Sequence, residues 1–131
     1  MTSKPGNAAY DPTNIFARIL RGELPCKKVY EDDHVLAFED IRPLLPVHVL
    51  VIPKGAYVGM NDFTATASGD EIAALYRAVG EVARLKGVAD SGYRIIVNNG
   101  VDGHQEVPHL HVHVLGGRKV GRMVGVQPAA D

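Results

Sequence analysis

Residues 109–117 read HLHVHVLGG, and this stretch decides how the centre of the fold is built. Three of the chain's six histidines, His109, His111 and His113, stand at every second position. Side chains of a β-strand point alternately to its two faces, so a strand here puts all three imidazoles on one side. The apolar residues between them then point into a core: Leu110, Val112 and Val114. We expect the imidazole face to meet a phosphate, a metal ion or solvent.

Four further segments have the composition of strands. Residues 27–31 and 34–39 predict a hairpin, and the apolar, largely β-branched run 47–52 predicts a strand covered on both faces. Residues 93–98 predict a strand that a glycine loop joins to the histidine stretch. Five strands with mostly short connections predict a largely antiparallel sheet.

Two helices complete the prediction. Residues 11–22 combine an acidic N-cap followed by proline, apolar residues at helical spacing and a final glycine, which predicts a short helix. Residues 55–67 show no clear period and predict a loop. Ser68 and Glu71 match a capping box before an apolar stripe that ends at Gly87, which predicts one long helix. The fold class is therefore α+β.

Composition limits the partners. At 131 residues the chain suits one domain with its own core, and its formal net charge of −1 gives no broad basic surface for nucleic acid. The longest apolar stretch, residues 44–53, is too short to span a bilayer, so we expect no membrane partner. The single cysteine, Cys26, can form no intramolecular disulfide, which favours a cytoplasmic protein. Residues 1–10 lack the apolar core of a signal peptide and predict a disordered leader.

The residues before the histidine stretch favour phosphate as the ligand. Gly100 and Gly103 let backbone amides approach an anion, and Gln105 and Asn98 add neutral donors. Three alternating rings extend over about 13 Å of strand, which suits an extended ligand better than one ion. A central histidine flanked by two others suits attack on phosphorus. An ordinary turn and an ordinary cap remain alternatives for the loop residues.

Taken in this order, the segments resemble the histidine triad (HIT) superfamily, whose signature is three histidines alternating with apolar residues and followed by one more apolar residue. Residues 109–115 match the signature at every position. Landmarks of its HINT branch are matched by residues 15–20, 36–41, 48–54 and 98–117. The resemblance implies a HIT domain over residues 11–117, with residues 118–131 as a C-terminal tail. It also implies a homodimer whose sheet extends across the two subunits.

The resemblance implies a mechanism centred on His111, which attacks the α-phosphorus of a purine nucleotide and forms a nucleotidyl-histidine that water hydrolyses. His113 would contact the phosphate oxygens, His109 would support the array, and His48 would back the triad. No metal or cofactor is expected, because imidazoles and amides supply the charge stabilisation. The HINT branch commonly cleaves purine nucleoside phosphoramidates such as adenylyl-amines and adenylyl-lysine, so we expect a phosphoramidate hydrolase.

The nucleotide site follows from the same resemblance. Apolar residues would form the base slot, and Asp40 would accept hydrogen bonds from the ribose. The expected nucleotide-binding residues are Ile15, Phe16, Ile19, Phe38, Asp40, Ile41, Asn98, Gly103, His104, Gln105, Glu106, His111 and His113.

The proton donor to a departing amine is left open by the sequence. Glu106 stands where some members have serine and is the candidate donor. His104 stands where glycine is frequent, and either contacts the ligand or is solvated. Arg118, Lys119 and Arg122 replace a tail that carries tryptophan in eukaryotic members, and either approach an acidic leaving group or are solvated.

Three other functions stay open at this point: a dinucleoside polyphosphate hydrolase, a non-catalytic nucleotide-sensing scaffold protein and a metal-binding protein. The apolar stripe from Ile72 to Ala83 is compatible with a dimer interface and equally with a role in the core alone.

Overall fold

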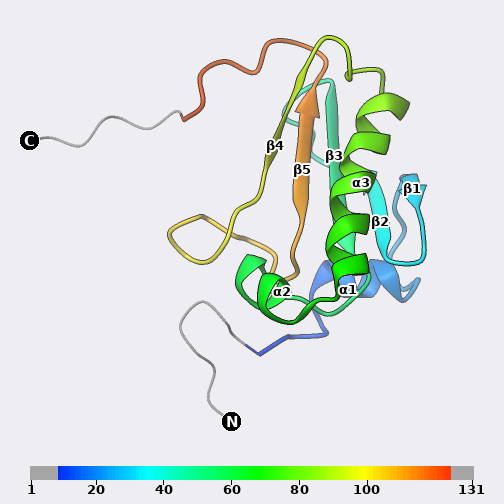
Figure 1. Ribbon diagram of the computed structural model, residues 1–131, viewed down its shortest axis with the longest axis vertical. Coiled ribbons are helices and arrows are strands. Elements are labelled where there is room, and N and C mark those ends of the chain that lie inside the picture. The colour runs from blue at the N-terminus through cyan, green and yellow to red at the C-terminus, as the bar shows by residue number, and fades with distance from the viewer. Residues whose placement is uncertain (1–8, 125–131) are drawn as a thin grey trace, which may run out of the picture.

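The structure is a computed structural model that describes residues 9–124. Within these residues the elements are α1 (Ile15–Leu20), β1 (Lys28–Glu31), β2 (Val35–Glu39), β3 (Val47–Pro53), α2 (Met60–Thr66), α3 (Gly69–Leu85), β4 (Tyr93–Ile96) and β5 (Val112–Gly116). The strands form one sheet in the order β1-β2-β3-β5-β4, and each pairing is antiparallel (Figure 1). The predicted α+β class and five-stranded antiparallel sheet are confirmed.

Two strand boundaries near the cavity differ from the prediction. β5 begins at Val112, so His109 and His111 precede the strand rather than lie within it. β4 ends at Ile96, two residues before the predicted end at Asn98. β3 lies at the centre and is buried along its whole length, as its apolar composition predicts.

The first helix begins later than predicted. Asp11 accepts a hydrogen bond from the Thr13 amide (2.9 Å) and closes a turn of its own. Asn14 is the N-cap of α1, because its side-chain oxygen accepts from the Ala17 amide at 2.9 Å. The sequence pattern marked the correct region but the wrong capping residue, since aspartate and asparagine both satisfy exposed amides.

The prediction of a loop over residues 55–67 is wrong, since α2 lies within it. Asp62 stabilises its first turn by accepting from the amides of Val58 (2.7 Å) and Gly59 (2.8 Å). Phe63 is fully buried in the core. A seven-residue helix with one buried anchor has too few turns to show a period, so tertiary packing rather than pattern fixes it.

The long helix α3 confirms its predicted start. Ser68 accepts from the Glu71 amide (3.1 Å), and the Glu71 carboxylate accepts from the Ser68 amide (3.0 Å). The helix ends at Leu85, two residues before Gly87, which adopts the left-handed φ of 73°. No helix among residues 9–124 is long and apolar enough to cross a membrane.

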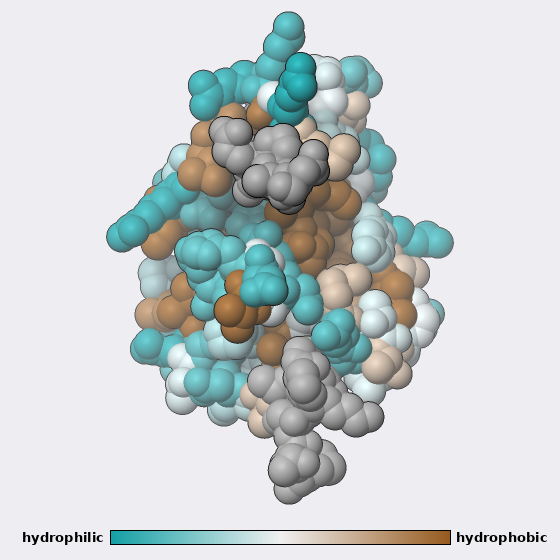
Figure 2. Space-filling view, turned by 90° about the vertical axis from the view of Figure 1, so that its left-hand side faces the viewer, coloured by the Kyte–Doolittle hydropathy of each residue, from teal (hydrophilic) through white to brown (hydrophobic). Residues whose placement is uncertain are grey.

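The edge strand β4 carries partly exposed apolar side chains. Tyr93 and Ile95 on β4 are 39% and 40% exposed, and Tyr76 and Leu85 on α3 are exposed as well. Figure 2 views the molecule from the side on which β4 lies, and apolar surface gathers near the middle of that view. The hydrogen-bonding edge of β4 that faces away from β5 has no partner strand among the described residues.

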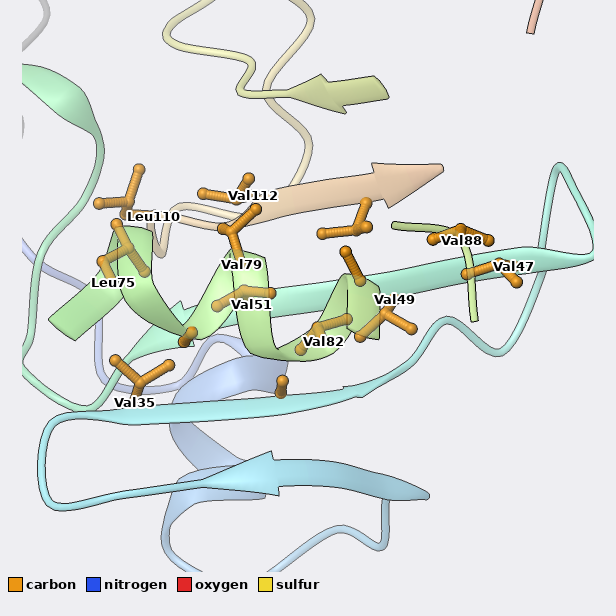
Figure 3. Close-up of a cluster of buried hydrophobic side chains, with 14 of the residues drawn as sticks. Val35, Val47, Val49, Val51, Leu75, Val79, Val82, Val88, Leu110 and Val112 are labelled. Atoms are coloured by element: carbon orange, nitrogen blue, oxygen red, sulfur yellow. The ribbon is translucent and has the colours of Figure 1, made fainter. Parts of the chain in front are cut away.

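Alternation along the strands divides the buried residues between two faces. Val49 and Val51 of β3 and Val112 of β5 pack against Leu75 and Val79 of α3 (Figure 3). A second cluster lies on the opposite face, beneath α1, and consists of Phe16, Leu36, Phe38, Leu50 and Ile52. The predicted core positions Leu110, Val112 and Val114 all lie on the α3 face. The histidines that alternate with these residues therefore lie on the opposite face.

Candidate active site

A cavity of about 450 Å³ opens on the sheet face that carries α1. It is lined by Ile15, Phe16, Ile19, Pro25, Cys26, Phe38, Glu39, Asp40, Ile41, Arg42, Leu44, His48, Leu50, Asn98, His104, Glu106, Val107, His111 and His113. These residues come from α1, β2, β3, β5 and the loops beside them, so the cavity exists only when distant segments are paired. Its volume is within the range of sites for small ligands.

Four predicted base-slot residues meet at the apolar end of the cavity. Ile15, Phe16 and Ile19 come from the same helix, and Phe38 comes from β2. The rings of Phe16 and Phe38 meet edge to face, with centroids 5.6 Å apart. Phe16 also meets the ring of His111 edge to face at 5.0 Å. One aromatic ring thus joins the apolar end to the histidines.

His109 lies behind the cavity and does not line it. Its Nε2 donates to the Pro53 carbonyl (2.9 Å), so Nδ1 is the acceptor and takes a hydrogen bond from the Tyr10 hydroxyl (2.7 Å). The side chain is fully buried, and burial lowers its pKa to about 4. His109 is therefore neutral at physiological pH, with both ring nitrogens used by the protein.

His111 has one nitrogen fixed and one free. Its Nδ1 donates to the His109 carbonyl (2.7 Å), which leaves the lone pair on Nε2. Burial lowers the pKa of His111, and the His109 hydrogen bond and the charges of Asp40 and Glu106 oppose that change less strongly. A neutral imidazole with a free lone pair in a cavity is a competent nucleophile.

His113 holds the opposite tautomer. The Leu44 amide donates to Nδ1 of His48 (3.0 Å), so the proton of His48 is on Nε2 and points to Nδ1 of His113 (2.9 Å). The proton of His113 is therefore on Nε2. Burial, together with the neighbouring histidines, lowers the pKa of His113 to about 4. His111 and His113 thus offer a lone pair and an N–H donor from adjacent positions of one face, with ring centroids 5.0 Å apart.

The register of the sheet produces this pairing of His48 with His113. Leu50 of β3 stands directly opposite His113 of β5, and His48 lies two residues before Leu50 on the same face. A diagonal neighbour in an antiparallel pair is within reach of a long side chain. Burial lowers the pKa of His48, so its ring is neutral and acts as a hydrogen-bond relay.

Asp40 follows β2 and faces the same cavity. One carboxylate oxygen accepts from the Arg42 amide (2.7 Å), and the other lies 3.4 Å from Nε2 of His48. Asp40, His48 and His113 bring one potential ligand atom each within 4.8 Å of one another, and they are the one such group of three in the described part of the chain. His109 cannot join such a group, because both of its ring nitrogens are engaged, and His48 could join it only by giving up one of its two hydrogen bonds.

Two predicted nucleotide contacts, Gln105 and Gly103, do not line the cavity. The Gln105 amide group donates to the carbonyls of Val58 (2.6 Å) and Val107 (3.0 Å), and its oxygen accepts from the Gly100 amide (3.0 Å). A Cβ at Gly103 would lie 2.6 Å from the Asn99 carbonyl oxygen. The structure gives these two residues a role in shaping the loop.

The mouth of the cavity is formed by the same loop. Asn98, His104 and Glu106 all line it, as predicted for residues that meet the ligand. The ring of His104 and the carboxylate of Glu106 are in contact, with Nε2 and Oε1 3.0 Å apart. Both side chains are exposed. Ile41 is 91% exposed and lies at the rim rather than in the slot.

The tail does not reach the cavity within the described residues. Arg94 donates to the carbonyls of Gly121 (2.6 Å) and Arg122 (3.0 Å), which holds the first part of the tail along β4. Arg118 and Lys119 line a separate hollow beside β4. Residues 125–131 of the predicted tail and residues 1–8 of the predicted leader lie outside the described residues.

Sequence reasoning missed several residues of the site. Tyr10 falls in the predicted leader, yet it bonds His109, which is 99 positions away. Cys26 and Arg42 come from loops without a pattern. Leu50 did carry a signal, since it shares the strand face of His48 by the period of two. Leu44 acts through its backbone amide, which no side-chain pattern can indicate.

Comparisons of sequence and of structure with known proteins agree with each other. Residues 21–120 match a family model described as the HIT domain. A HIT-like protein of Azospirillum brasilense is 65% identical over 115 residues, covering 88% of this chain and 94% of that protein. The purine nucleoside phosphoramidase of Escherichia coli K12 is 41% identical over 110 residues, covering 84% and 92%. The structure of a histidine triad protein from Clostridium difficile aligns with a TM-score of 0.77 at 39% identity, covering 88% of this chain and 100% of that chain.

Proposed function

This chain belongs to the HIT domain family, and from this premise we propose that it hydrolyses purine nucleoside phosphoramidates through a covalent intermediate on His111. The similarity to the phosphoramidase of Escherichia coli and to HIT family hydrolases makes the chain a hydrolase. The observation that carries the proposal is the pair of opposite tautomers at His111 and His113.

The first half of the reaction forms a bond between Nε2 of His111 and the α-phosphorus. As the ring lone pair attacks, the phosphorus–nitrogen bond breaks and its electron pair leaves with the amine, which takes up one proton. The Nε2–H of His113 suits donation to a phosphoryl oxygen whose charge increases in the transition state. The His109 carbonyl stabilises the positive charge that develops on the attacking ring, because it accepts from Nδ1.

The second half returns the enzyme to its starting state. Water adds to phosphorus, the bond to Nε2 breaks, and the electron pair returns to the ring while one water proton is released. The sum is one phosphoramidate and one water converted to a nucleoside monophosphate and an amine. The charges that develop on the phosphoryl oxygens and on the attacking ring are met by an imidazole and a backbone carbonyl, so we propose that the reaction proceeds without a metal.

The nucleoside would lie along the cavity from its apolar end to its mouth. Phe16, Phe38, Ile15 and Ile19 suit the flat face of a purine, and Asp40 suits the ribose hydroxyls. A slot built from apolar side chains gives affinity through buried area and distinguishes the base edges weakly, so adenine and guanine should both be accepted.

The test is the substitution His111→Ala, assayed by release of nucleoside monophosphate from an adenosine phosphoramidate. We expect turnover to fall at least a thousandfold, since the covalent route is lost, while calorimetric binding of the monophosphate changes by less than about fivefold. The matched control His34→Ala removes an exposed histidine from the hairpin outside the cavity and should leave turnover unchanged. Full activity of His111→Ala would overturn the mechanism.

The same assay separates the alternative functions. A strong preference for a dinucleoside polyphosphate over the phosphoramidate would identify a polyphosphate hydrolase. Binding of nucleotide with no turnover of either would identify a sensing protein. Loss of activity on exhaustive chelation, restored by a divalent cation, would show that the reaction needs a metal, for which Asp40, His48 and His113 are the candidate ligands.

A further inference from the structure

The proton donor to the departing amine is the one part of the proposed reaction with no residue yet assigned. We propose that His104, oriented by Glu106, donates this proton as an imidazolium and recovers it from the attacking water. The inference rests on the proposed function and adds a catalytic residue to it. It also gives Glu106 a different role from the one expected, that of a positioning residue.

The backbone at His104 is the first observation. His104 has a φ of 61° and is the one non-glycine residue with positive φ among residues 9–124. Glycine adopts this conformation without the steric cost that a side chain brings. The loop therefore carries an imidazole at a position where its backbone favours glycine, and strain of this kind is concentrated at functional sites.

The position of the ring is the second observation. His104 lines the same cavity as His111 and His113, and it does so at the mouth, where the amine must leave. Its side chain is 86% exposed, so it can exchange protons with water between turnovers. The carboxylate of Glu106 lies 3.0 Å from its Nε2 and orients the ring at the cavity mouth.

Five other titratable groups of the cavity are less suited to the role. His111 is the attacking nucleophile. Burial holds the pKa of His113 at about 4, so its ring carries no second proton at neutral pH. His48 is buried behind His113. Asp40 accepts hydrogen bonds from Arg42 and faces His48. Glu106 accepts from His104 in the geometry observed.

The proton balance closes with this assignment. As the phosphorus–nitrogen bond breaks, the electron pair on the amine takes the proton of the His104 imidazolium, which leaves a neutral ring and a free amine. When water then attacks the nucleotidyl-His111, its proton passes to the neutral ring of His104. The enzyme returns to its starting protonation after one turnover, and no further reactant is needed.

The test compares two adenylate substrates that differ in the leaving group. An adenosine phosphoramidate of an alkylamine must be protonated as it departs, whereas the p-nitrophenyl ester of the same nucleotide releases a stable anion. The ratio of kcat/KM for the two substrates, measured on one preparation, does not depend on how much of the protein is folded. We expect His104→Asn to lower this ratio about a hundredfold, because general acid catalysis contributes that much or more.

The variants are chosen to keep the loop intact. Asparagine tolerates a positive φ, and His104→Gly removes the strain altogether, so both should fold. Glu106→Gln should lower the ratio about tenfold, since it weakens the contact that orients the His104 ring. Val101→Asn, at a 94% exposed position of the same loop, should leave the ratio unchanged.

An unchanged ratio in both His104 variants would overturn the assignment while leaving the proposed function standing. An equal loss on both substrates would overturn it as well, since it would show a role in binding or in attack. If the wild-type protein releases nucleotide from neither substrate, the proposed function fails and this inference fails with it.

Discussion

His111 and His113 each have one ring nitrogen bonded to the protein, and that contact decides what the other nitrogen can do. The carbonyl of His109 fixes the tautomer of His111, and the ring of His48 fixes that of His113. Residues of one type, spaced evenly in the sequence, thus acquire different chemical roles. The family resemblance predicted different roles for the three rings. The hydrogen-bond partners that cause the difference are not part of the sequence pattern.

The pH dependence of stability follows from the same burial. Burial lowers the pKa of His109 to about 4, whereas the unfolded chain has an ordinary value near 6.5. Between these values the unfolded chain binds a proton that the folded chain does not, so stability is complete above about pH 6.5 and falls as the pH decreases. We expect His109 to account for a loss of about 2 kcal/mol in the free energy of unfolding between pH 7 and pH 5.

Urea unfolding of the wild-type protein and of His109→Gln at the two pH values measures this contribution. The variant should be less stable at pH 7 and should lose less on acidification. His34→Gln, in an exposed position, serves as the control and should keep the wild-type dependence. A variant with the full wild-type loss between pH 7 and pH 5 would show that His109 is not the source.

Tyr10 supports the array from outside the predicted domain. Its hydroxyl donates to Nδ1 of His109, and the two rings meet edge to face at 5.6 Å. Tyr10→Phe keeps the ring contact but leaves a buried acceptor unpaired, so we expect a loss of about 1–3 kcal/mol in urea unfolding. Tyr30→Phe is the control, since its hydroxyl meets the Asp32 carboxylate in a half-buried position and should cost less. Equal losses in the two variants would contradict the role given to Tyr10.

At the scale of elements, the active-site loop is anchored to the start of α2. The side-chain oxygen of Asn99 accepts from the Met60 amide (2.8 Å), one of the free amides of the first helical turn. Gln105 adds a bond to the Val58 carbonyl. The loop that carries Asn98 and His104 is therefore held by a helix that the sequence did not predict.

Gly59 is where this anchor is most sensitive to substitution. A Cβ there would overlap the Asn99 side-chain oxygen, so Gly59→Ala must move that side chain and disturb its bond to the Met60 amide. We expect kcat/KM for the phosphoramidate to fall at least tenfold, because misplacing groups at the cavity mouth weakens catalysis. Gly69→Ala places the same methyl group where nothing lies within 4 Å and should leave the kinetics unchanged. Equal kinetics in the two variants would show that the anchor does not matter.

Elements that depend on residues close together in the sequence could be predicted, and those that depend on distant residues could not. The period of two placed Leu110 and Val112 on the core face correctly, and the capping box at Ser68 marked the start of α3, because both patterns are local. α2 and the bond from Tyr10 could not be predicted, since each depends on partners that are distant in sequence. The sequence likewise could not predict that the Gln105 side chain bonds a backbone carbonyl instead of facing the cavity.

At the scale of the whole molecule, the open edge of β4 and the apolar residues beside it support the predicted homodimer. Tyr93 and Ile95 of this strand are partly exposed, and Tyr76 and Leu85 of α3 are exposed as well. We expect light scattering to give twice the mass of the 14.1 kDa chain. Ile95→Lys should shift the protein to monomer by placing a charge in the paired surface. Val101→Lys, on an exposed loop, is the control, and a wild-type monomer would refute the prediction.

The order of the strands has a consequence for how the protein is made. β5 is the last strand to be synthesised, yet it lies between β3 and β4, and β4 pairs with no other strand of the sheet. A nascent chain that has not yet released residues 112–116 from the ribosome holds β4 without a partner and β3 with one edge bare. The arrival of this segment pairs both strands and brings His113 to His48 in the same step. Completion of the sheet and assembly of the candidate site are thus a single event in biosynthesis.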